Sequence, residues 1–313
     1  MSAAPSHIRP ATRGDLRDIV DLLNVCDVAE VGEPDTIADD VESDWGMKGF
    51  TLTRDAWVAV GDGGALAGYA YVGDQFRTGE LEADLWVHPE REEPELGTHL
   101  LNLAERRGRE LAAARGYDAP VLDIFCIGVN RAKRELLLRR GYALSRTVYR
   151  MSADLGDAVV ALPAPESIVI RPFRLDADER VMYDAMNEAF EDHFRHSEEP
   201  FEAWKTRLLG HASFDPDLWS LAWDGDEAVG AVIAYDHGDL GWVQGLGVRR
   251  PWRRRGLGGA MLTQTFAALA ARGQVRVELG VDAEGETQPL RMYERAGMHV
   301  TFTYELYARP LTG

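Results

Sequence analysis

The sequence predicts an α/β protein made of two tandem copies of one domain, each a mixed, mostly antiparallel sheet flanked by helices. The first observation is the order of segments, strand, helix, hairpin, strand, loop and helix, strand, helix and strand, which is typical of an α/β domain. The second is that this order occurs twice in 313 residues, a length that suits two ordinary domains. The third is a loop rich in arginine and glycine that joins a strand to a helix in the second copy.

Each copy opens with a short strand that ends in Arg-Pro. Residues 7–10 read His-Ile-Arg-Pro, and residues 168–172 read Ile-Val-Ile-Arg-Pro. Apolar residues then recur at helical spacing in 16–23 and again in 181–189. The matching openings indicate an internal duplication.

The repeat continues with a hairpin, because an Asp-Gly turn joins two apolar strands in residues 57–70 and again in residues 221–232. Between the copies, Pro163 and Pro165 are typical of a linker. We therefore predict a first domain at residues 1–151, a linker at 152–167 and a second domain at 168–313.

Residues 242–273 hold the segment around which the second copy is organised. The run 243–248 is typical of a strand, the loop 253–258 reads Arg-Arg-Arg-Gly-Leu-Gly, and an apolar stripe at helical spacing follows, as far as Gly273. The unpaired N–H groups of a helix's first turn and the helix dipole attract anions. Because Gly256 and Gly258 lack Cβ, a diphosphate can lie directly on the backbone.

This loop resembles the acyl-CoA-binding motif of the GCN5-related N-acetyltransferases, Gln/Arg-x-x-Gly-x-Gly/Ala, with Arg253, Gly256 and Gly258 at its fixed positions. The resemblance implies the acetyltransferase fold over nearly the whole chain and acetyl-CoA as acyl donor. It also implies that the loop binds the pyrophosphate and that the preceding strand pairs with the pantetheine arm. The implied cofactor-binding residues are Leu246, Gly247, Val248, Arg253, Arg254, Arg255, Gly256, Leu257, Gly258 and Gly259.

The first copy departs from this motif. Aligned on Gly97, it carries Glu92 at the arginine position and Glu95 at the first glycine, with Glu93 and Pro94 between them. Carboxylates repel a diphosphate, and proline removes a backbone donor. We therefore predict that the first domain is a degenerate copy that does not bind CoA productively.

The same resemblance implies two groups that act on protons. Tyr293 matches a tyrosine that lies near the CoA sulfur in many of these enzymes and protonates the departing thiolate; a core tyrosine is the alternative. Many relatives carry a catalytic glutamate on the strand before the loop, where this chain has Trp242, Gln244 and Gly245. His193 is the candidate base because of its intrinsic pKa. A route through ordered water stays open, as do other acidic or imidazole side chains: Glu188, Glu191, Asp192, His196, Asp236 and His237.

Tandem copies of this fold resemble the mycothiol synthase group of acetyltransferases. The segment Val31-Gly32-Glu33 is similar to a stretch of that group in which the glutamate contacts substrate, so Glu33 is a candidate substrate-binding residue. A loop charge before Pro34 is the alternative.

Composition limits the partners. The formal net charge of −18 argues against nucleic acid or an anionic membrane, although the five arginines of residues 249–255 leave a nucleic-acid hypothesis to be tested by salt. Cys26 and Cys126 indicate neither a disulfide framework nor a metal site. Without a signal peptide or a membrane-length apolar run, we expect a cytoplasmic monomer or homodimer that acetylates a small-molecule amine. A non-catalytic module that binds or senses acyl-CoA is the alternative.

Overall fold

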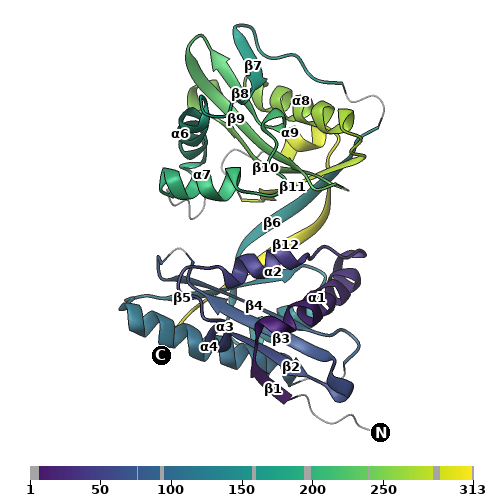
Figure 1. Cartoon of the computed structure of the whole chain (residues 1–313), viewed down its shortest axis with the longest axis vertical. Coiled ribbons are helices and arrows are strands. Elements are labelled where there is room, and N and C mark those ends of the chain that lie inside the picture. Colours follow the sequence, from purple (N-terminus) through teal and green to yellow (C-terminus); the bar gives the residue numbers. More distant parts are fainter. Residues whose placement is uncertain are drawn as a thin grey trace. The chain divides into compact units, whose positions relative to one another are not determined.

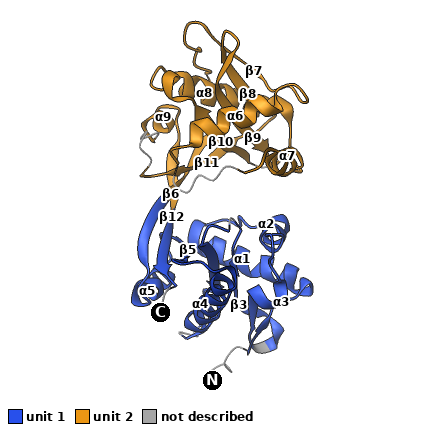
Figure 2. Cartoon of the chain, turned by 90° about the vertical axis from the view of Figure 1, so that its left-hand side faces the viewer, with its two compact units in different colours: residues 1–147, 304–313 blue, residues 148–303 orange. Residues whose placement is uncertain are grey.

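The computed structural model describes residues 7–75, 77–91, 95–156, 160–193, 199–238, 240–284 and 290–311. The chain divides into two compact units (Figures 1 and 2). Unit 1 comprises residues 1–147 and 304–313, and unit 2 comprises residues 148–303. The predicted α/β class and its two tandem domains are confirmed. The division falls at residues different from the expected boundaries at 151 and 168.

Unit 1 holds a sheet with the strand order β1-β2-β3-β4-β5-β12, in which β12 is His299–Pro310. Neighbouring strands are antiparallel except β4 and β5, which are parallel. Its elements are β1 (His7–Pro10), α1 (Leu16–Val31), α2 (Ala38–Trp45), α3 (Leu52–Asp55), β2 (Ala56–Val60), β3 (Leu66–Gly73), β4 (Glu80–Val87), α4 (Leu96–Arg115), β5 (Val121–Ile127) and α5 (Arg131–Arg139).

Unit 2 repeats this plan with the order β6-β11-β10-β9-β8-β7, in which β6 is Ala143–Asp154 and β10 and β11 are the parallel pair. Its elements are β7 (Ile168–Pro172), α6 (Glu179–Phe190), α7 (Phe201–Leu209), β8 (Ser220–Asp224), β9 (Glu227–Asp236), β10 (Gly241–Val248), α8 (Leu257–Ala271), β11 (Arg276–Asp282) and α9 (Leu290–Arg295). Of the five apolar residues predicted to form a stripe on the helix after the loop, Met261, Leu262, Phe266 and Leu269 of α8 are buried and Ala270 is half-buried.

The duplication is visible in one ion pair that both copies share. Arg9 of β1 binds Asp15 at 2.6 Å, and Arg171 of β7 binds Asp178 at 2.6 Å. Each arginine also donates to the carbonyl of the proline that follows it. The arginine hydrogen bond holds the pKa of Asp15 at about 2. The repeated Ile-Arg-Pro therefore ties the first strand of each copy to the start of its first helix.

The two copies exchange their last strands. Strands β6 (Ala143–Asp154) and β12 (His299–Pro310) both cross the division between the units, as their change of colour in Figure 2 shows. Residues 148–154 of β6 pair antiparallel with β11, and residues 304–310 of β12 pair antiparallel with β5. Residues 152–154, which we expected in the linker, belong to this exchanged strand.

The hydrophobic cores follow the exchange. Met151 and Ala153, which precede the expected second domain, are buried in the core of unit 2. Tyr307 and Leu311, from the end of the chain, are buried in the core formed by β5 and α4 of unit 1. Each unit therefore contains a strand that belongs by sequence to the other copy.

Candidate active site

The loop between β10 and α8 has the backbone shape of an anion site. Arg254 and Gly256 have φ of 62° and 87°, in the left-handed region. Residues that alternate between right- and left-handed conformations turn successive N–H groups toward one point. A Cβ on Gly256 would have no atom within 4 Å, so the space beside the backbone is open.

The N–H groups in this loop lack protein acceptors. The first helical hydrogen bond of α8 runs from Ala260 to the carbonyl of Gly256, at 3.1 Å. Within the described part of the chain, no protein group accepts a hydrogen bond from the N–H groups of residues 254–259. The helix's first turn leaves such donors unpaired by its geometry, and the dipole adds positive potential there. The run of donors fits an anion.

The arginines of this region divide into two groups. Arg254 and Arg255 are exposed, and the described residues offer neither a carboxylate partner. Arg249 instead binds Glu188 and Glu227, and Arg250 binds Asp192. Two charges therefore stand beside the unpaired N–H groups, whereas those of the preceding turn are matched by carboxylates.

Arg253, the arginine of the motif, is directed at the protein. Its Nε donates to the carbonyl of Val248 at 2.9 Å, and its Nη2 donates to the carbonyl of Ala189 at 2.9 Å. Its Nη1 lies 3.5 Å from Asp192, and its backbone N–H donates to the carbonyl of Arg250 at 3.2 Å.

Strand β10 forks away from β11 next to this loop. The two strands pair only at Gly241 with Val277 and at Trp242 with Glu278. Beyond Trp242 the side of β10 toward β11 pairs with no other strand among the described residues, and a bulge between Val243 and Gly245 breaks the register with β9. A free strand edge offers backbone groups to an extended ligand. Gly245 and Gly247 of β10 face α6, because a Cβ on Gly247 would lie 2.7 Å from the Cβ of Ala189 and one on Gly245 would lie 2.6 Å from Cε of Met186.

Tyr293 lies on α9, and the residue before it, Met292, lies close to the start of α8. A Cβ on Gly258 would come within 2.8 Å of Sδ of Met292 and 3.7 Å of Cδ2 of Leu246. Tyr293 itself is buried, and this burial raises the pKa of its hydroxyl to about 12. A phenol with this pKa is protonated at neutral pH and so can give a proton. In the first copy the matching residue is Leu137, which is fully buried.

The candidate bases have different surroundings. His193 is exposed just beyond α6, with its ring 4.4 Å from that of Phe190. Glu188 and Asp192 are bound by arginines, Asp236 accepts from Gln274, and His237 contacts Ser213. Glu191 lies 3.9 Å from Arg250, and His196 lies outside the described residues.

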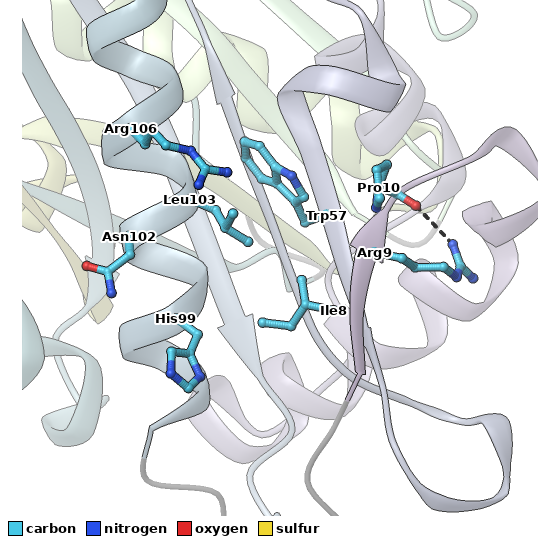
Figure 3. A pocket seen from close by; sticks show the side chains of 8 residues that line it. All are labelled: Ile8, Arg9, Pro10, Trp57, His99, Asn102, Leu103 and Arg106. Carbon is cyan, nitrogen blue, oxygen red and sulfur yellow. Dashed lines mark hydrogen bonds between the residues drawn. The ribbon is translucent and has the colours of Figure 1, made fainter.

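The remaining candidates belong to unit 1. Glu33 is exposed in the turn after α1, beyond the left-handed Gly32. Residues 92–94 of the degenerate loop lie outside the described residues. A pocket of about 500 Å³ lies beside β1 and α4. Figure 3 shows its lining residues, none of which the sequence analysis named as a site candidate: Ile8, Arg9, Pro10, Trp57, His99, Asn102, Leu103 and Arg106.

Among the described residues, no group of three His, Cys, Asp or Glu side chains is arranged to hold a metal ion. Within the same residues, no helix is both long enough and apolar enough to cross a membrane.

The chain is similar to known acetyltransferases over nearly its full length. Residues 180–298 match the Acetyltransferase (GNAT) family. The mycothiol acetyltransferase of Geodermatophilus obscurus is 31% identical over 309 residues, which are 95% of this chain and 96% of the relative. That of Streptomyces scabiei is 32% identical over 79% of this chain and 77% of the relative.

Solved structures of acetyltransferases are also similar to this chain. The GCN5-related N-acetyltransferase from Sphaerobacter thermophilus has a TM-score of 0.86 and 31% identity, over 100% of this chain and 98% of its own. A tandem GNAT protein from the clavulanic acid biosynthesis pathway shares the fold at 14% identity, with a TM-score of 0.72 over 98% of this chain and 99% of its own.

Proposed function

Because the chain belongs to the GCN5-related N-acetyltransferase (GNAT) family and is an acyltransferase, we propose that it transfers an acetyl group from acetyl-CoA to the primary amine of a small molecule, at one site in unit 2. The observation that carries this proposal is the run of unpaired N–H groups at residues 254–259. A diphosphate is the anion that such a run, with Arg254 and Arg255 beside it, suits best.

The residues of unit 2 supply what the transfer needs. When bound, acetyl-CoA supplies the acetyl group as a thioester. The edge of β10 near 246–248 offers backbone N–H groups to polarise a carbonyl. Tyr293 holds a proton at its hydroxyl for the leaving sulfur, because burial keeps its pKa at about 12. His193 is the proposed acceptor of the amine's proton, with an ordered water as the competing route.

We place no second site in unit 1. Strands β4 and β5 also pair only part of the way, from Glu80 to Ala83 of β4. The next residue, Asp84, is bound by Lys133 from α5, and this pair is largely shielded from solvent. An ion pair of the protein's own side chains at the point where the strands part argues against a pantetheine arm there.

One CoA per chain is therefore expected. Isothermal titration of the whole protein with CoA should give a stoichiometry near one, since among the described residues it is unit 2 that combines the unpaired donors at 254–259, two arginines without a carboxylate partner and a fork without an ion pair in it. Two equivalent sites in the titration would contradict the assignment of unit 1 as degenerate.

The reaction itself is tested by release of free thiol from acetyl-CoA with a panel of amines. The panel includes the amine that mycothiol acetyltransferases accept, because relatives of 31% and 32% identity carry that name. Release that depends on an amine supports the enzyme. Tight CoA binding with no release for any amine supports instead the non-catalytic acyl-CoA-binding module.

Tyr293→Phe is expected to slow turnover far more than it weakens CoA binding. Phenylalanine keeps the buried ring and removes only the hydroxyl, so the fold should hold. A positioned general acid contributes about 10²–10⁴-fold, and we expect about 10²-fold here because water substitutes in part. The checks are kcat with an accepted amine and the Kd for CoA. Turnover within about threefold of wild type would make Tyr293 a packing residue.

A further inference from the structure

The C-terminal end of α6 is attached to the loop proposed to hold the acyl donor. The last four carbonyls of a helix have no partner inside the helix. Ala189 is next to the last residue of α6, and its carbonyl accepts from Nη2 of Arg253 at 2.9 Å. The positive guanidinium at this end is also attracted by the negative pole of the helix dipole. Arg253 therefore caps α6 from a position 64 residues further along the chain.

The same side chain holds the end of β10. Its Nε donates to the carbonyl of Val248 at 2.9 Å, so one rigid planar group joins the last residue of the strand to the last turn of the helix. The helix can come this close because β10 has glycines beneath it. A Cβ on Gly245 would lie 2.6 Å from Cε of Met186, and one on Gly247 would lie 2.7 Å from the Cβ of Ala189.

The attachment continues past the helix. Asp192 accepts from Nε of Arg250 at 2.7 Å and lies 3.5 Å from Nη1 of Arg253. The hydrogen bond from Arg250 lowers the pKa of Asp192, so its carboxylate stays charged at neutral pH. The chain that leaves α6 is thus bound at Arg250 as well as at Arg253. The next residue is His193.

We infer that Arg253 is a positioning residue, which fixes the end of α6, and with it His193, against the acyl-donor loop. The inference rests on the proposed function and changes the part that Arg253 plays in it. Through α6 and Asp192, Arg253 positions the part of the site that holds His193 and receives the amine. The positive charge beside the diphosphate comes from Arg254 and Arg255.

The test compares Arg253→Gln with Arg255→Gln, an exposed arginine two residues away that contacts no described carboxylate. Arg253→Gln removes the positive charge and the guanidinium group that donates to the carbonyls of Val248 and Ala189. Hydrogen exchange at the end of α6, residues 187–193, should then speed up on the order of tenfold, since hydrogen bonds from a charged donor are the stronger ones. The KM of an accepted amine should rise about as much, while the KM for acetyl-CoA stays within about twofold.

Arg255→Gln should give the reverse pattern, with unchanged exchange in α6 and a Kd for CoA raised on the order of tenfold. Arg253→Lys keeps the charge but reaches only one carbonyl, so its hydrogen exchange in α6 and its KM for the amine should lie between those of wild type and Arg253→Gln. The same variant replaces Arg253→Gln in the test if Arg253→Gln does not fold. Weakened CoA binding with normal α6 exchange in the Arg253 variants would overturn the inference. If wild-type protein binds no CoA, the proposed function fails, and exchange in α6 alone decides whether Arg253 holds the helix.

Discussion

Gly256→Glu is expected to raise the Kd for CoA by about 10²–10³-fold. The new carboxylate would stand among the N–H groups of residues 254–259, where we place the diphosphate. Two like charges about 4 Å apart repel by about 4 kcal/mol at an effective dielectric constant of 20, and each 1.4 kcal/mol is about tenfold in affinity. The fold should survive, because a Cβ at this position meets no atom within 4 Å. Calorimetric titration with CoA measures the effect.

The matched control is Gly273→Glu, at the other end of the same helix. Gly273 has φ of 90°, close to the 87° of Gly256, and a Cβ there also meets no atom within 4 Å. Both variants therefore carry a similar left-handed strain of about 1–2 kcal/mol. Only the variant at 256 should lose CoA. Equal affinities in the two variants would show that the loop before α8 does not hold the diphosphate.

A chain that ends at residue 303 is expected to lose the fold of unit 1 and keep that of unit 2. The deletion removes the seven residues of β12 that pair with β5, from Tyr304 to Pro310. It also removes buried Tyr307 and Leu311 from the core, and Arg309, whose Nη1 lies 2.9 Å from the buried Glu105. Loss of a large buried side chain costs about 2–5 kcal/mol, and domains are stable by only about 5–15 kcal/mol.

Scanning calorimetry with and without CoA checks this prediction. The truncated chain should retain a single unfolding transition, and CoA should shift it upward, because ligand binding stabilises the folded unit that binds it. A chain that ends at Leu311 is the control, since it keeps every residue of β12 and should melt like the full protein. A truncated chain with an undiminished unfolding enthalpy would show that unit 1 does not depend on residues 304–313.

Local patterns predict much of this fold. Each of three patterns depends on residues that are close in sequence: the Ile-Arg-Pro openings, the Asp-Gly hairpins and the apolar spacing of the helix after the loop. The structure confirms the tandem α/β plan that they predict. The partner of each last strand is not a local property. Residues 148–154 pair with β11 and residues 304–310 with β5, although a strand's alternation of side chains says only which face it buries and not which edge it joins. The sequence therefore shows two copies but not which strands they exchange.

The candidate site also has features that local sequence predicts and features that depend on the packing of distant segments. The glycine spacing predicts a loop of exposed N–H groups, and the structure has such a run at 254–259. The contacts of Arg253 could not be predicted, because Ala189 and Asp192 lie more than 60 residues earlier and reach it only through the packing of α6 on β10. The bulge in β10 and the fork after Trp242 likewise depend on neighbouring strands. The roles of Tyr293, His193 and Glu33 stay predictions.

The strand exchange also sets an order of events on the ribosome. Domains of a growing chain generally fold in the order in which they are made, from the N-terminus. Here unit 2 has all its residues once the chain reaches position 303, whereas the sheet of unit 1 waits for residues 304–310. Until then β5 is an open edge, which other chains can pair with. We expect the half that is synthesised first to be completed last, so a nascent chain stalled near its end exposes this edge to aggregation or to chaperones.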